Sequence, residues 1–254
     1  MLKLENIYFQ NIIENINISI LREETYCIIG KNGSGKSLIL NIACGLLKPT
    51  SGNVYFNNIN IYNLKRTKKI KIMERIGFLF QNSALISNLT LFENIELVLK
   101  YHNPEKSKEK EMKDKVEYFL KKFDLIDKKD VTPPYLSLGE KKLGAFARAV
   151  INDPDILILD EPTALIDRHT KSVMIDIIED YKDSNKPIFL VSNDNDLIFN
   201  VVDRVGLLIN KTIKYEGEPY ELKYSDNKEI KEFLSSIKIS KEIDIDKQTL
   251  SLLK

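Results

Sequence analysis

Hydrophobic and polar positions alternate along the chain with two different periods. Short β-branched runs predict strands, and apolar residues spaced three and four apart predict helices between them. The predicted strands cover residues 1–9, 15–21, 25–29, 53–56, 75–80, 156–160, 187–192 and a pair within 204–216. The predicted helices cover residues 36–47, 90–100, 105–123, 137–152, 168–183 and 195–202. Alternating strands and helices are typical of an α/β fold in which helices cover a sheet.

The pattern changes at two places along the chain. The middle, about 84–152, is mostly helical, and residues 225–254 are rich in charge. In this last segment a narrow helical stripe is apolar, formed by Ile230, Phe233, Leu234 and Ile237. A stripe this narrow predicts an appendage that packs on a neighbouring subunit or stays mobile. We therefore expect one domain over residues 1–224, with a helical subdomain at about 84–152, followed by the appendage.

Composition narrows the possible partners. The 254 residues include 38 Lys and Arg against 37 Asp and Glu, a net charge of +1, so excess positive charge does not predict a nucleic-acid partner. Apolar runs such as 156–159 are too short to cross a bilayer, and charges near the N-terminus argue against a signal peptide. We expect a cytoplasmic chain that meets a membrane only through a partner. Cys27 and Cys44 lack metal spacing and predict buried, reduced thiols.

A glycine-rich segment carries the strongest chemical signal. It lies between a predicted strand and a predicted helix and fits the pattern G-x-x-x-x-G-K-[ST]. Its residues are Gly30, Lys31, Asn32, Gly33, Ser34, Gly35, Lys36 and Ser37. Glycines let the backbone curl so that successive N–H groups face one anion, and the helix start adds its positive dipole end. We predict that this phosphate loop binds a nucleotide, with Lys36 on the β- and γ-phosphates and Ser37 on Mg²⁺.

A buried strand ends in two carboxylates. The aliphatic run at 156–159 is typical of a parallel strand buried on both faces, and Asp160 and Glu161 follow it. Ligand sites of such sheets lie at the carboxyl ends of the strands. We expect Asp160 to hold Mg²⁺ and Glu161 to polarise the attacking water.

Three further segments make the chain resemble a known family. They are Gln81 after the strand at 75–80, Leu136-Ser137-Leu138-Gly139-Glu140, and Glu161-Pro162-Thr163-Ala164-Leu165-Ile166-Asp167. With the phosphate loop, in this order and spacing, they make residues 1–216 resemble the nucleotide-binding subunit of ABC transporters. The resemblance implies an ABC-type phosphate-loop NTPase: a RecA-like core sheet, an antiparallel β edge, and a helical subdomain that carries the signature motif.

The resemblance also implies a function and partners. The chain would be an ATPase that uses ATP and Mg²⁺, with Gln81 contacting Mg²⁺ or the attacking water. Ser137 and Gly139 would cap the nucleotide bound to a second copy in a head-to-tail dimer, and Asp167 would lie in the loop that crosses the interface. Taken alone, the local sequence favours a plain helix cap for Ser137, and Asp167 is typical of an ordinary helix N-cap, a role compatible with a place at the interface. A separate membrane permease would hold the chain at the cytoplasmic face of the cell membrane.

Three positions depart from the family pattern. Leu138 replaces the first glycine of the signature, and Asn193 stands where the family normally has a histidine that touches the γ-phosphate. An asparagine amide still donates a hydrogen bond, so Asn193 remains a catalytic candidate. Asn11 occupies the place of the aromatic residue that stacks on adenine. These departures leave open a weakly hydrolysing or regulatory subunit.

The type of transporter is less defined. The run from Phe80 to Ile95 is similar to the ATPase of Mla-type, MCE-associated phospholipid transport systems, which makes a phospholipid one candidate substrate. A generic segment that docks a permease explains the same run equally well. Soluble ABC proteins of ribosomes or DNA generally carry two nucleotide domains or a long insertion, whereas one phosphate loop is visible here. A kinase or GTPase is disfavoured by the signature segment and by Asn210-Lys211-Thr212-Ile213, which lacks the Asp that reads guanine.

Overall fold

Two sheets organise the chain, and the computed structural model describes residues 1–102 and 109–236. The antiparallel sheet has the order β2-β1-β4-β5, with β1 (Leu2–Phe9), β2 (Ile13–Ile20), β4 (Ser51–Phe56) and β5 (Ile59–Asn60). The second sheet has the order β10-β9-β3-β8-β7-β6, with β3 (Thr25–Gly30), β6 (Ile76–Leu79), β7 (Ile156–Asp160), β8 (Ile188–Val191), β9 (Arg204–Ile209) and β10 (Thr212–Gly217). Neighbouring strands of the second sheet pair in parallel, except that β10 is antiparallel to β9.

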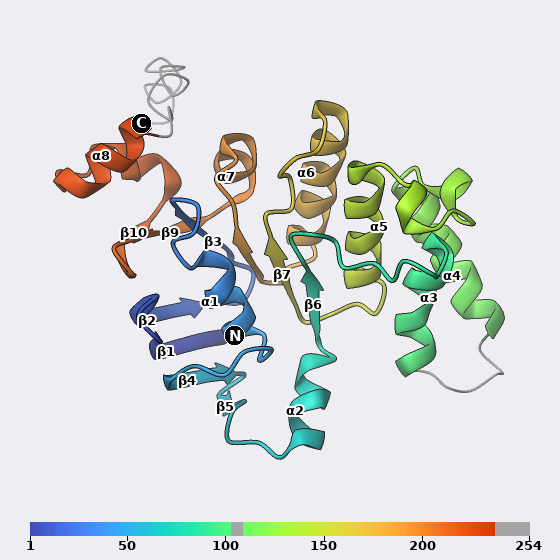
Figure 1. Ribbon diagram of the computed structural model, residues 1–254, viewed down its shortest axis with the longest axis horizontal. Helices are drawn as coiled ribbons and strands as arrows, with labels where there is room; N and C mark the ends of the chain where they lie inside the picture. Colours follow the sequence, from blue (N-terminus) through green and yellow to red (C-terminus); the bar gives the residue numbers. More distant parts are fainter. Residues whose placement is uncertain (103–108, 237–254) are drawn as a thin grey trace.

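The helices fall into groups around the second sheet. They are α1 (Lys36–Ala43), α2 (Arg66–Met73), α3 (Leu91–His102), α4 (Glu109–Lys122), α5 (Leu138–Val150), α6 (Arg168–Lys182), α7 (Asn195–Val201) and α8 (Lys228–Ser236). Short 3-10 turns lie at Ile126–Lys128, Pro133–Tyr135 and Pro219–Tyr224. The helices α3, α4 and α5 lie at the β6 side of the molecule, and α8 lies at the opposite side, beyond β9 and β10 (Figure 1). No helix within the described residues is long and apolar enough to span a bilayer.

The second sheet separates two hydrophobic cores. On β3, Cys27 and Ile29 belong to the core shared with helices α3 to α7, whereas Tyr26 and Ile28 belong to the core shared with α1 and the antiparallel sheet. All five residues of β7 are buried, which explains why its sequence is a continuous aliphatic run. The predicted α/β architecture is therefore present. Both cysteines are buried and free, as predicted.

Each predicted strand and helix overlaps an observed one, but the prediction missed β5 and α2. No residue of α2 is buried, so the sequence there has no apolar periodicity that could indicate a helix. The helix predicted over 36–47 ends at Ala43, and Gly45 just beyond it has a φ of +81°, a left-handed conformation typical of a helix end. The first residues of the helix predicted over 105–123 lie outside the described residues.

The expectation for the C-terminal stripe needs a correction. Ile230, Phe233 and Leu234 are at most 9% exposed and join the same core as α3 to α7. Helix α8 therefore packs on its own chain rather than on a neighbouring subunit, because the 3-10 turn Pro219–Tyr224 before it supplies apolar contacts that a local stripe does not reveal. The fourth residue of the stripe, Ile237, lies outside the described residues, and the domain boundary at 224 stays a prediction.

Candidate functional site

The phosphate loop joins β3 to α1 and surrounds a buried lysine. Gly33 and Gly35 have left-handed φ values of +76° and +103°, and a Cβ on Gly35 would come within 2.8 Å of Ile13 Cγ2. Lys36 is 6% exposed, and its Nζ donates hydrogen bonds to the carbonyl oxygens of Gly30 (2.9 Å) and Lys31 (3.2 Å). Burial lowers the pKa of Lys36 from its ordinary value, and the nearby Glu161 opposes this effect. The loop therefore presents backbone N–H groups and one partly desolvated cation to an anion.

The carboxylates at the end of β7 share this site. Asp160 is 6% exposed and accepts a hydrogen bond of 2.9 Å from Ser37 Oγ. Burial raises the pKa values of Asp160 and Glu161 above their ordinary values, and the Lys36 ammonium opposes both shifts. A cavity of about 400 Å³, which we call the phosphate cavity, is lined by Asn32, Gly33, Gly35, Lys36, Ser37, Leu38, Gln81 and Glu161. The structure thus brings together the predicted phosphate loop, Gln81 and the carboxylates.

The backbone of Glu161 is held in an uncommon conformation. Its φ is +49°, which non-glycine residues seldom adopt. The N–H of Glu161 donates to the Val191 carbonyl at 3.0 Å, and its carbonyl accepts a hydrogen bond of 2.5 Å from Lys142 Nζ. These contacts on both sides of the peptide explain how the strained residue keeps its position.

Lys142 was not among the predicted site residues. It is 2% exposed, and burial lowers the pKa of its ammonium to about 8 while Glu161 and Asp160 oppose that shift. The sequence held one signal for it. Lys142 shares a helix face with Gly139, Leu143 and Phe146, where the helical period predicts an apolar residue, and a lysine at such a position needs a partner.

The signature segment lies apart from the phosphate cavity. Ser137 caps α5 in a capping box: its Oγ accepts from the Glu140 N–H at 3.2 Å, and Glu140 Oε2 accepts from the Ser137 N–H at 2.7 Å. Ser137 is exposed and the Leu138 side chain is 43% exposed. Gly139 packs against Thr170 of α6, where a Cβ would come within 2.8 Å of the Thr170 side chain. None of the three lines the phosphate cavity of its own chain.

The remaining candidates have structural contacts. Asn193, after β8, uses its Oδ1 to accept a hydrogen bond of 3.2 Å from the Gly30 N–H, which ties it to the phosphate loop. Asp167 caps α6 by accepting from the N–H groups of His169 and Thr170, each at 3.0 Å. Asn11 lines a second cavity beside the phosphate loop.

The match with a family model decides the classification. The model of the ABC transporter family matches residues 13–164, which contain the phosphate loop, Gln81, the signature and both carboxylates. The chain belongs to this family. It is an ABC-type ATPase, and its fold class is the one predicted from the sequence.

Relatives of this ABC ATPase are named as subunits of import systems. The chain is 36% identical over 194 residues to HrtA of Staphylococcus haemolyticus, whose name assigns it to hemin import; the match covers 76% of this chain and 86% of HrtA. It is 34% identical over 197 residues to the methionine import ATP-binding protein MetN 2 of Paraburkholderia xenovorans, covering 77% of this chain and half of that protein. A dimeric structure of the ATP-binding cassette MJ0796 with ADP and Pi superposes with a TM-score of 0.79 and 31% identity, covering 86% of this chain and 98% of that one.

Proposed function

We propose that the chain is the ATP-hydrolysing subunit of an importer and that the phosphate cavity holds the triphosphate of ATP. The observation that carries this proposal is the meeting of Lys36, Ser37, Gln81 and Glu161 around one cavity. Lys36 pairs with the β- and γ-phosphates, and the backbone N–H groups of the loop hold the remaining phosphate oxygens. A cation that is already buried and fixed by two carbonyl oxygens binds phosphate with little loss of side-chain freedom.

The donor set beside the loop fits Mg²⁺. Ser37 Oγ and Asp160 Oδ1 lie 2.9 Å apart, and Gln81 lines the same cavity. These are hard oxygen ligands, and Mg²⁺ usually takes one or two protein ligands together with phosphate oxygens and water. Within the described residues, no group of three or more His, Cys, Asp or Glu side chains is placed to hold a metal ion. When bound, Mg²⁺ would neutralise charge on the phosphates.

Glu161 acts as the general base in this proposal. Burial raises its pKa toward the range in which a carboxylate accepts a proton effectively at neutral pH. The hydrogen bonds to its N–H and carbonyl fix the backbone, so the carboxylate keeps its position beside the γ-phosphate end of the cavity. The proton of the attacking water passes to the Glu161 carboxylate as the water oxygen bonds to the γ-phosphorus, and the bond from that phosphorus to the β,γ-bridging oxygen breaks, so that ADP and phosphate leave. Asn193 supports the loop through Gly30 and keeps an amide N–H₂ group available as a donor.

A second copy completes the site. Ser137 and Gly139 do not line the phosphate cavity of their own chain, and Ser137 and Leu138 are exposed. The start of α5 offers N–H groups and a positive dipole end suited to a phosphate bound by another copy. The dimeric cassette to which the chain is similar supports pairing of two copies, and the head-to-tail arrangement is part of this proposal.

The partner at the membrane is a separate permease, which places the chain at the cytoplasmic face of the cell membrane. The import functions in the names of HrtA and MetN 2 support a transport role over a ribosomal or DNA-bound one. Those names specify hemin and methionine, so they lend no support to a phospholipid substrate. The proposed cargo is an imported solute.

The replacement Glu161→Gln tests the proposal. It removes the proton acceptor and spares Lys36, Ser37 and Asp160, so the variant binds ATP with Mg²⁺, stops hydrolysis and accumulates as an ATP-dependent dimer. Light scattering after gel filtration and phosphate release measure both effects. The control is Glu111→Gln, which changes an exposed carboxylate on α4. Normal turnover of Glu161→Gln together with the permease would refute the assignment of the base.

A further inference from the structure

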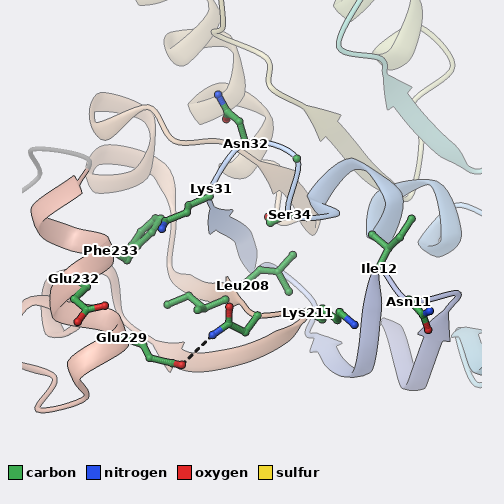
Figure 2. Close-up of a pocket in the computed structure, with 13 residues that line it drawn as sticks. Asn11, Ile12, Lys31, Asn32, Ser34, Leu208, Lys211, Glu229, Glu232 and Phe233 are labelled. Carbon is green, nitrogen blue, oxygen red and sulfur yellow. Dashed lines mark hydrogen bonds between the residues drawn. The ribbon is translucent and has the colours of Figure 1, made fainter.

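A larger cavity lies on the other side of the phosphate loop. Its volume is about 580 Å³, within the range of small-molecule sites. It is lined by Asn11, Ile12, Lys31, Asn32, Gly33, Ser34, Leu208, Ile209, Asn210, Lys211, Glu229, Glu232 and Phe233. Figure 2 shows α8 facing the loop across this space, with Lys31 extending from the loop toward Phe233. We call it the α8 cavity.

The sheet order determines which end of a nucleotide can reach the α8 cavity. The strand β3 ends in the phosphate loop, with β8, β7 and β6 on one side of it and β9 and β10 on the other. With the triphosphate in the phosphate cavity, as proposed above, the γ-phosphate end lies on the β7 and β6 side, where Glu161 and Gln81 are. The nucleoside end therefore extends toward β9 and β10, and both cavities share Asn32 and Gly33 at the tip of the loop.

The walls of the α8 cavity differ in charge. Lys31 lies on the loop side, whereas Glu229 and Glu232 lie on α8. Glu229 is half-buried, and its Oε1 accepts a hydrogen bond of 2.9 Å from Asn210 Nδ2 (Figure 2). The side chain of Glu232 is 70% exposed, and its Oε1 lies 3.9 Å from Lys228 Nζ. An ionised carboxylate accepts hydrogen bonds only, so this wall repels phosphate and favours a neutral group that carries donors.

The carboxylate of Glu229 is held in place by the packing of its helix. Ile230 and Phe233 are each 2% exposed and anchor α8 in the core of the chain. The N–H of Glu229 donates to Asn227 Oδ1 at 2.9 Å, which caps the start of α8. A fixed acceptor loses little conformational entropy when a ligand binds to it.

We propose that the nucleoside end of the bound nucleotide occupies the α8 cavity and that Glu229 accepts a hydrogen bond from it. The inference rests on the proposed phosphate site. The ligand group is a hydrogen-bond donor of adenosine, either the base amino group or a ribose hydroxyl. Helix α8 is then a determinant of nucleotide affinity. It lines the same cavity as Asn11, the residue that stands where the family resemblance implies an adenine-stacking aromatic.

The test compares ATP with inorganic tripolyphosphate, each with Mg²⁺, by equilibrium titration of the full chain. Glu229→Ala lowers ATP affinity about tenfold, as expected for a hydrogen bond to a charged acceptor, and leaves tripolyphosphate affinity unchanged. Glu221→Ala, an exposed carboxylate outside both cavities, changes neither. Unchanged ATP affinity in Glu229→Ala, or equal losses for both ligands, overturns the inference.

Two analogues identify the donor. If the ribose is the partner, the natural chain binds 2′,3′-dideoxyATP, which lacks both ribose hydroxyls, more weakly than ATP, and Glu229→Ala binds the two equally. If the amino group is the partner, the same convergence occurs with purine riboside triphosphate, which lacks that group. Convergence with neither analogue overturns the contact to Glu229. Failure of the natural chain to bind tripolyphosphate is a separate result that refutes the phosphate site itself.

Discussion

The phosphate loop and the signature segment are built in opposite ways. Around the loop, Lys36 and Asp160 are each 6% exposed and their polar atoms are bonded within the chain. At the signature, Ser137 is exposed and Leu138 is 43% exposed. The phosphate loop, with its buried charged groups, can bind an anion by itself. The exposed start of α5 can contact a phosphate only when another molecule presents that phosphate to it. Under the proposed pairing of two copies, a single chain contains both motifs and yet holds half of each nucleotide site.

The largest expected effect comes from removing the buried lysine of the phosphate loop. Lys36→Ala deletes a buried cation whose charge-assisted bonds to phosphate are each worth about 1.5–3 kcal/mol, so ATP affinity falls by at least about tenfold. Titration calorimetry measures the loss. Lys48→Ala removes an exposed lysine after α1 and serves as the control. Intact ATP affinity in Lys36→Ala would show that the loop does not hold the phosphates.

Mixing two inactive variants sharpens the comparison. A subunit with Lys36→Ala keeps its signature, and a subunit with Ser137→Ala keeps its phosphate loop. In random dimers half the pairs are mixed, and each mixed pair has one intact site of two, so turnover recovers to about a quarter of its natural value. ATPase assays of the variants, alone and mixed in the assembled complex, provide the measurement.

The helix cap of α3 provides a matched control for the cap that Ser137→Ala removes from α5. Thr90 and Glu93 form a capping box at α3 with the same hydrogen-bond lengths, 3.2 Å and 2.7 Å, as the box of Ser137. Each replacement by Ala costs about 1 kcal/mol of stability. Thr90→Ala loses the same kind of helix cap outside the proposed site, so this variant should keep its turnover. If the mixture of Lys36→Ala and Ser137→Ala subunits recovers no turnover, the result argues against a site shared between copies.

The two halves also differ in how far the sequence predicts them. The phosphate loop and the strand before Asp160 follow from local spacing and from a continuous aliphatic run, and the structure has both. The prediction that Ser137 contacts the nucleotide of a second copy rests on the family resemblance, because the local spacing indicates only a helix cap. Helix α2 and the packing of α8 were missed for a physical reason. The first buries no residue, and the second depends on tertiary contacts that no local periodicity encodes.

Lys142 links the two halves, because it lies on the signature helix and holds the Glu161 carbonyl. Burial lowers its pKa to about 8, so the folded chain binds fewer protons than the unfolded chain between pH 8 and the ordinary lysine pKa of 10.5. Stability therefore rises as pH increases through this window, by on the order of 1–3 kcal/mol. Lys142→Met should lose this rise in urea unfolding at pH 7 to 10. The half-buried Lys141→Met should keep it, and an identical profile for both variants would contradict the assignment.

The smallest expected effect concerns Asn193, which supports the phosphate loop: its Oδ1 accepts a hydrogen bond of 3.2 Å from the Gly30 N–H. Its amide oxygen is engaged by the loop, so only its N–H₂ group can serve the γ-phosphate. A preorganised donor can be worth about 10²–10³ in rate, and Asn193 supplies one, so Asn193→His should change turnover of the assembled complex by less than about tenfold. The natural chain should show no step attributable to an imidazole near pH 6–7, whereas the histidine variant should gain one as its imidazole titrates. Steady-state ATPase activity across pH, with Glu161→Gln as the background, measures both effects.

If the turnover of the natural chain is no higher than that of Glu161→Gln, the chain binds ATP without hydrolysing it, and the result favours a regulatory subunit.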